Sequence, residues 1–288
     1  MRQKKVSDAE NRPAGFADKL LRVKRPPLDQ QFQELSNTES LTLQVEAPGD
    51  WPDGRQIEVR VHRWGSGRNA LLVHGWQGRR SDLMGIGQKL VEAGYAVWLP
   101  DLPGHGDSAG ERLSIPLAAA VLQALDRIAG PFALVLGHSI GGACVVQALE
   151  QGLSAERVVL LATPTHYGHW ARFMARKAGL EGDEDAILLR LERLIGLHPD
   201  RIDMRRQAAK MSQPALFIHS SDDPVVPYKG AEAVASIWPG AEWLLVDGLG
   251  HHGEFLSDKV VLERVSAFVG SAPTHLETSP ATAQRANL

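Results

Sequence analysis

The hydrophobic residues near the start of the chain alternate with polar ones. Apolar side chains occupy every second position in residues 41–45 and again in residues 57–61. Successive side chains of a strand point to opposite faces, so this period of two predicts strands with one buried and one solvated face. The residues Trp51-Pro52-Asp53-Gly54 between them are typical of a turn. We therefore expect an antiparallel hairpin in this part of the chain.

The later hydrophobic segments are continuous rather than alternating. Short apolar runs without polar interruptions suit strands that are buried on both faces, as in a parallel sheet. Six segments have this pattern: residues 70–73, 96–99, 132–136, 158–161, 215–218 and 243–246. Helical patterns lie between them, at about residues 81–93, 115–129, 140–151, 228–238 and 257–269.

Capping residues agree with these helices. Ser81, Ser114 and Ser257 are candidate N-caps, and Gly94 and Gly152 are candidate C-terminal stops. Repeated alternation of strand and helix with right-handed crossovers predicts an α/β fold, with a mostly parallel, doubly wound sheet covered by helices.

Residues 164–213 interrupt this alternation because they contain no strand pattern. One predicted helix carries Trp170, Phe173, Met174 and Lys177, and a second covers residues 187–195. The segment therefore predicts a small helical cap, inserted between two parts of one core at residues 40–163 and 214–270.

The two ends of the chain lack periodic hydrophobic residues. Residues 1–39 predict an N-terminal arm, and residues 271–288 predict a flexible C-terminal tail. Residues 1–30 hold eight Lys/Arg against four Asp/Glu. This excess allows two interpretations, a solvated arm or a contact with an acidic or membrane surface.

Composition and charge argue against nucleic-acid-binding and membrane-spanning classes of protein. With 31 Lys+Arg against 34 Asp+Glu, the net charge of −3 gives no indication of nucleic-acid binding. The longest apolar run, residues 117–122, is far shorter than the ~18 residues of a membrane helix, and no secretory signal is evident. The single cysteine, Cys144, cannot form an intrachain disulfide, so we expect a cytoplasmic protein. The oligomeric state is not predicted.

A candidate nucleophile follows one of the buried runs. The segment Gly137-His138-Ser139-Ile140-Gly141 lies between a predicted strand and a predicted helix. Glycines on either side allow a sharp turn that holds Ser139 in a strained conformation, with its hydroxyl at the carboxyl edge of the sheet. This context favours a nucleophilic serine over a simple helix N-cap.

A serine hydroxyl needs a base, and the base needs an orienting acid. His251 and His252 follow the last strand, and His251 is favoured because it comes directly after Gly248-Leu249-Gly250. Asp222 and Asp223 follow the preceding strand, and only one of two adjacent carboxylates can point at the base. The order Ser, Asp, His is the one expected for this strand–turn–helix elbow.

Backbone N–H groups near the serine could stabilise an oxyanion. Trp76 lies in His74-Gly75-Trp76, after the strand at residues 70–73, and Ile140 directly follows the serine. The N–H groups of Trp76 and Ile140 are the predicted pair of donors. We interpret His74 as structural, because a base is already present downstream.

Taken together, these motifs resemble the α/β-hydrolase superfamily over about residues 41–269. The resemblance rests on His74-Gly75-Trp76, residues 101–108, the elbow around Ser139, residues 223–227, and residues 248–251. In that family the acid lies four residues before the proline of the Asp-x-x-Val-Pro segment. The resemblance therefore selects Asp223 over Asp222.

The resemblance implies a serine hydrolase with Ser139, Asp223 and His251 as its catalytic triad. The expected reaction cleaves an ester-type acyl bond of a small molecule through an acyl-enzyme, without a cofactor. The same machinery would serve a thioesterase, lactonase, amidase or acyltransferase, and a non-catalytic binding protein on this fold is a further alternative. Trp76, Trp170 and Phe173 are expected to line an apolar pocket.

Two competing site types are less well supported. Residues 104–109 match a dinucleotide fingerprint, with Asp126 at a suitable distance. That site needs a helix that begins at the glycines, whereas the helical pattern here begins after Ser114. The histidines show no metal-ligand spacing within one helix. We therefore expect neither a nicotinamide or flavin cofactor nor a metal.

Overall fold

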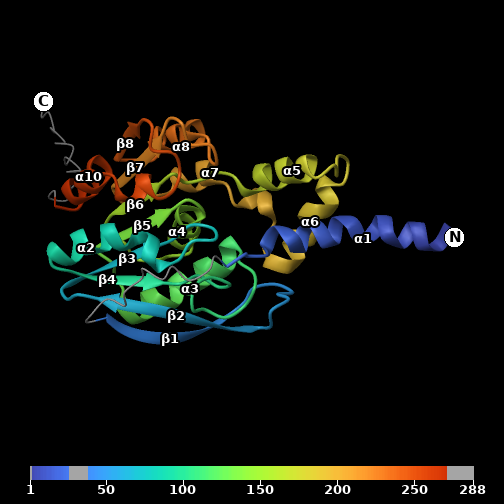
Figure 1. The fold of residues 1–288 in the computed structure, drawn as a ribbon, viewed down its shortest axis with the longest axis horizontal. Coiled ribbons are helices and arrows are strands. Elements are labelled where there is room, and N and C mark those ends of the chain that lie inside the picture. The colour runs from blue at the N-terminus through green and yellow to red at the C-terminus, as the bar shows by residue number, and fades with distance from the viewer. Residues whose placement is uncertain (1, 26–37, 271–288) are drawn as a thin grey trace, which may run out of the picture.

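A computed structural model describes residues 2–25 and 38–270, and a single eight-stranded sheet organises the chain. The strands are β1 (Thr38–Glu46), β2 (Gln56–Trp64), β3 (Arg68–Val73), β4 (Tyr95–Pro100), β5 (Leu134–His138), β6 (Val158–Leu161), β7 (Ala215–Ser220) and β8 (Ala241–Val246). Their order across the sheet is β1-β2-β4-β3-β5-β6-β7-β8 (Figure 1).

The directions of the strands confirm the predicted architecture. Strand β2 is antiparallel to both β1 and β4, and the remaining neighbours are parallel. In the hairpin, Leu43 lies opposite Val59, which keeps the alternating apolar side chains of both strands on one face. The central strands β5, β6 and β7 are buried along their whole length, as continuous apolar runs require.

Strand β8 differs from the expectation of burial on both faces. Its residues are half-buried or exposed, and Leu245 keeps 38% of its surface accessible. The reason is its place at the edge of the sheet, where β7 is its only strand neighbour among the described residues.

Helices cover both faces of the sheet. Helices α3 (Ile115–Ala129), α4 (Ile140–Glu150) and α8 (Tyr228–Ala235) bury their apolar residues in one core cluster. Helices α2 (Met84–Glu92) and α10 (Lys259–Gly270), with the short α9 (Glu254–Ser257), pack into a second cluster on the other face.

Three of the five expected helix ends are as predicted. The Ser114 hydroxyl accepts the N–H of Leu117, and Gly94 and Gly152 have positive φ after their helices. Two caps differ. Ser81 lies inside the 3-10 turn η1 (Arg80–Leu83), and the carboxylate of Asp258, not Ser257, accepts the first N–H groups of α10. A carboxylate accepts these bonds more strongly than a hydroxyl does.

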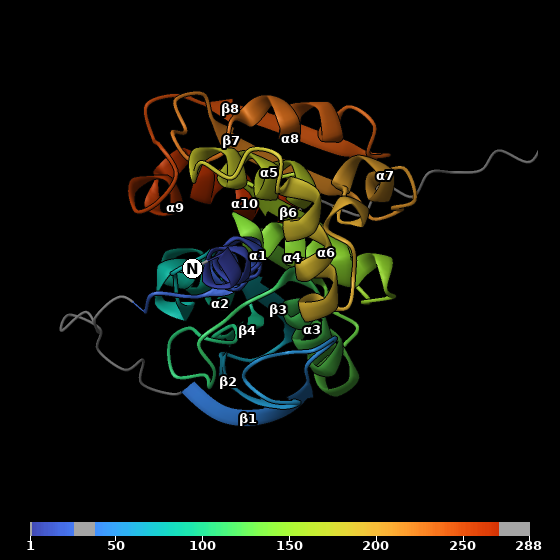
Figure 2. The ribbon, with the colours of Figure 1, turned by 90° about the vertical axis from the view of Figure 1, so that its right-hand side faces the viewer.

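The segment between β6 and β7 contains helices and no strand of the sheet. It contains α5 (Tyr167–Lys177), α6 (Glu184–Ile195), the 3-10 turn η2 (Pro199–Arg201) and α7 (Met204–Ala208). Helices α5 and α6 stand together with α1 (Arg2–Leu21) on one side of the sheet (Figures 1 and 2). The division of the chain into core and cap stays a prediction.

Residues 17–21 of the N-terminal arm pack on the rest of the protein. Ala17, Leu20 and Leu21 are buried, and α1 packs along α6. The backbone after α1 pairs with the chain ahead of α3, through an isolated antiparallel bridge between Arg22 and Arg112. The predicted contact with an acidic or membrane surface is untested, and residues 26–37 and the expected C-terminal tail lie outside the described residues. No helix in the described part of the chain is both long and apolar enough to span a membrane.

Candidate active site

The turn between β5 and α4 holds Ser139 in a strained conformation. Its φ of 52° lies in the left-handed region that residues other than glycine rarely adopt. The turn also brings backbones close together. A Cβ at Gly141 would lie 2.4 Å from the carbonyl oxygen of Val73, and one at Gly137 would lie 2.5 Å from the Cα of Gly142. The flanking glycines are therefore required by close packing, as the sequence pattern indicated.

Three side chains that are far apart in sequence meet at this turn. The Ser139 hydroxyl lies 2.9 Å from Nε2 of His251. Nδ1 of the same ring lies 2.6 Å from Oδ2 of Asp223. His251 and Ser139 are both buried, with 4% and 7% of their surface accessible. The arrangement places a base next to the hydroxyl and an acceptor at the other ring nitrogen, so that a proton can move from Oγ to Nε2.

The carboxylate of Asp223 is held by several donors. Its Oδ1 accepts the N–H groups of Val225 and Val226 at 2.8 and 2.9 Å. Burial alone would raise the pKa of Asp223, but hydrogen bonds from His219, His251 and these two N–H groups outweigh it and hold the pKa well below its usual value. Asp223 therefore stays ionised and can stabilise a positive charge on the His251 ring.

Asp222 points elsewhere. Its carboxylate accepts hydrogen bonds from the Ser220 hydroxyl and from the Gly250 N–H. These bonds lower the pKa of Asp222 and tie β7 to the loop that carries His251. The structure thus separates two adjacent carboxylates that local sequence could not tell apart.

His219 is a site residue that the sequence analysis missed. It is fully buried at the end of β7, and its Nε2 lies 2.8 Å from the Val226 carbonyl and 3.1 Å from Oδ2 of Asp223. One N–H shared between these acceptors fixes both the carboxylate and the loop that follows it. Its place four residues before Asp223 at a strand end was the available signal.

The loop after β3 carries the first of the two predicted oxyanion donors. The Trp76 N–H has no acceptor among the described residues, and Ile140 is the first residue of α4, where the N–H has no intrahelical partner. Two histidines shape this loop. His105 accepts the N–H of Gln77 at 3.0 Å, and His74 accepts the N–H of Leu102 at 2.9 Å. His74 is thus a buried structural group.

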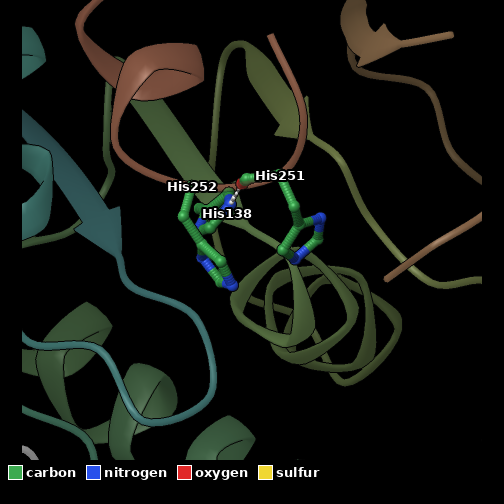
Figure 3. A group of neighbouring side chains, drawn as sticks. All are labelled: His138, His251 and His252. Atoms are coloured by element: carbon green, nitrogen blue, oxygen red, sulfur yellow. Dashed lines mark hydrogen bonds between the residues drawn. The ribbon is translucent and has the colours of Figure 1, made fainter. Parts of the chain in front are cut away.

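A third histidine holds the catalytic loop from behind. Nε2 of His138 lies 2.9 Å from the carbonyl oxygen of His251 and donates to it (Figure 3). Burial lowers the pKa of His138 to about 3, so this ring stays neutral. His252 is exposed, and it is His251 whose ring nitrogens lie within hydrogen-bond distance of Ser139 and Asp223.

Ring nitrogens of His138, His251 and His252 lie within 4.8 Å of one another, a spacing that the sequence analysis did not foresee. Both nitrogens of His251 already face Ser139 and Asp223. A metal bound here would displace the serine hydroxyl, so this cluster does not supply a metal cofactor for the arrangement described above.

Comparison with known proteins decides the family. Residues 70–264 match the model of the alpha/beta hydrolase family. The chain belongs to this family. The pimeloyl-[acyl-carrier protein] methyl ester esterase of Xanthomonas campestris pv. campestris is 26% identical over 252 residues, and the match covers 73% of this chain and 98% of that protein. The protein of the same name from Xanthomonas axonopodis pv. citri is 27% identical over 251 residues, with the same coverage.

Solved structures share the fold of this alpha/beta hydrolase. An esterase from Pyrococcus furiosus superposes with a TM-score of 0.61 at 18% identity, covering 87% of this chain and 95% of its own. A bromoperoxidase from Bacillus anthracis superposes with a TM-score of 0.59 at 20% identity, covering 80% and 100%.

Ser139 of this alpha/beta hydrolase lines a pocket of about 180 Å³ whose walls are mostly apolar. Trp76, Trp170 and Leu20 line it, together with residues of α7 and of the segment ahead of α3. Leu20 comes from α1, a contribution that the sequence analysis did not anticipate. Phe173 is not part of the wall. It is 48% exposed, and the Lys177 ammonium lies 4.8 Å from its ring centre.

The buried histidines of this alpha/beta hydrolase make its stability sensitive to acid. Burial lowers the pKa of His105 and of His138 from 6.5 to about 3. Below pH 6.5 the unfolded chain binds protons that the folded chain does not, so stability falls as the pH drops from about 6.5 toward 3. We expect each histidine to cost about 2 kcal/mol of unfolding free energy between pH 7 and pH 5.

Urea unfolding at pH 7 and pH 5 measures this loss. The His105→Gln variant should lose less stability between the two pH values than the wild type, because glutamine does not titrate. An equal pH dependence for His105→Gln and wild type would contradict the prediction.

Proposed function

We propose that this chain is a serine hydrolase that cleaves a carboxylic ester through an acyl-enzyme intermediate. The observation that carries the proposal is the continuous line of hydrogen bonds from the Ser139 hydroxyl through both nitrogens of His251 to Asp223. The esterase names of its relatives support the same bond type.

Acylation begins with proton transfer. His251 takes the proton of Ser139 at Nε2 while Oγ attacks the ester carbonyl carbon, and the negative charge moves to the carbonyl oxygen. The N–H groups of Trp76 and Ile140 bind this oxyanion, a contribution typically worth about 3 kcal/mol for each donor. Asp223 stabilises the imidazolium. The intermediate then collapses, and Nε2 gives its proton to the departing alkoxide.

Deacylation repeats these steps with water. His251 removes a proton from a water molecule while the water oxygen attacks the acyl carbon. When the intermediate collapses, the bond between the acyl carbon and Ser139 Oγ breaks, and Nε2 of His251 returns the proton to Oγ. The products are a carboxylic acid and an alcohol, and the protein returns to its starting protonation state. The apolar pocket suits a small to medium uncharged group next to the ester.

A fluorophosphonate probe tests the nucleophile and its competence together. We expect covalent labelling of the folded protein, with the label mapped by mass spectrometry to the peptide that contains Ser139. As the probe is added, the labelled fraction should rise while hydrolysis of 4-nitrophenyl butyrate falls in proportion. Hydrolysis that survives complete labelling, or a label on another residue, would contradict the proposal. Labelling without ester hydrolysis would instead favour another acyl bond.

A further inference from the structure

A groove of about 860 Å³ adjoins the apolar pocket. Leu20, Trp76 and Trp170 line both hollows, so the two meet along these three side chains. Trp76 also provides one of the proposed oxyanion donors. A substrate that reacts at Ser139 can therefore extend past the two tryptophans and into the groove.

The groove is strongly cationic. Four basic residues line it, Lys19, Arg22, Lys24 and Arg25, and Glu111 is its single acidic residue among those described. All four cations come from the end of α1 and the few residues after it. Figure 2 shows this helix beside α6, against which it packs.

The two arginines are occupied in fixing the segment to the core. Arg22 pairs with Asp18 at 3.0 Å and with Glu111 at 2.9 Å. The Arg25 guanidinium donates to four backbone carbonyls, those of Gly104, Gly106, Ser108 and Gly110. Backbone bonds add to this attachment, since Val23 donates to Glu111 and Leu113 donates to Leu21.

The two lysines take no part in this attachment. Lys19 and Lys24 are exposed, and within residues 2–25 and 38–270 neither ammonium group makes an ion pair or a hydrogen bond. Their backbone is nevertheless held in place by the bonds around it. The fold thus presents two ammonium groups, unpaired among the described residues, on a fixed strip at the rim of a groove that leads to the nucleophile.

We propose that this groove binds the anionic end of the substrate, and that Lys19 and Lys24 recognise it. The substrate class is an ester with an apolar group beside the reacting carbonyl and a carboxylate or phosphate at its far end. This inference rests on the proposed esterase function. A lysine ammonium acts as a mobile point charge, which suits an anion that reaches the groove at variable length.

Two matched pairs of esters test the proposal. In the first, mono(4-nitrophenyl) adipate is compared with 4-nitrophenyl hexanoate, so that the carboxylate is on the acyl half. In the second, butyryl glycerol 3-phosphate is compared with monobutyrin, so that the phosphate is on the alcohol half. For each pair, the ratio of kcat/KM for the anionic over the neutral ester is measured at low and high salt.

We expect this ratio to fall about three- to tenfold in the Lys19→Gln/Lys24→Gln double variant for at least one pair, mainly through a higher KM. Salt should lower the wild-type ratio and have little effect on the ratio of the variant. The charge-matched control, Lys89→Gln/Lys259→Gln, changes exposed lysines on α2 and α10 and should keep the wild-type ratio. The pair that responds identifies which half of the ester carries the anion.

A ratio that is unchanged in the double variant for both pairs, with neutral esters still hydrolysed, would overturn the groove assignment and leave the esterase function intact. If the wild-type protein were not labelled at Ser139 by the fluorophosphonate, the function on which the inference rests would instead be overturned. The two failures are therefore distinguishable in the same preparations.

Discussion

Replacing Ser139 with alanine is expected to lower kcat for 4-nitrophenyl butyrate on the order of 10⁴–10⁶-fold. Alanine removes the attacking oxygen. Because it has the same Cβ as serine, it adds no steric strain to the left-handed backbone of the turn. The remaining N–H donors can still polarise the ester carbonyl, which is why some rate above that in water should survive.

Initial rates at saturating ester, with circular dichroism to check the fold, measure this effect. Ser212→Ala, at an exposed serine before β7, is the control and should retain wild-type rates. A Ser139→Ala protein with near wild-type turnover would remove Ser139 from the mechanism.

The second large effect is expected at Asp223. The Asp223→Asn variant should lose about 10⁴-fold in kcat, because an amide cannot stabilise the imidazolium and favours the wrong tautomer of His251. Asp222→Asn is the matched control, one residue away and also in the turn that follows β7. Its carboxylate binds Ser220 and Gly250 rather than the ring, so a much smaller loss is expected.

Comparison of kcat for the two variants at one pH and in one preparation checks this assignment. A larger loss for Asp222→Asn would reverse the roles of the two residues. Similar losses for both would indicate that the loop, rather than one carboxylate, limits the reaction.

Much of the site could be predicted because its signals are local. The elbow needs glycines at fixed offsets from Ser139, and those offsets are visible in a short segment. The buried strands are equally visible as continuous apolar runs. Because the carboxyl ends of parallel strands meet at one sheet edge, the sequence alone places the base and the acid near the serine.

The part that escaped prediction depends on contacts between distant residues. Among the described side chains, Ala17, Leu20 and Leu21 bury α1 against the rest of the protein, and a network of charges around Arg112 adds to the attachment. Arg112 binds Asp18 at 2.9 Å and also pairs with Asp53, two residues that lie far from it in sequence. No periodic pattern reports such contacts, so the sequence alone did not predict that this polar segment packs on the core. His219 was missed for a similar reason, since its role depends on where Val226 and Asp223 turn back toward it.

The position of Leu20 has a practical consequence for protein engineering. A shortened recombinant chain that starts at β1 would retain every reacting group, yet one wall of the cavity beside them would be missing. Trimming the amino terminus to aid crystallisation would therefore change which molecules the enzyme accepts, and selectivity measured on such a fragment would describe a different catalyst.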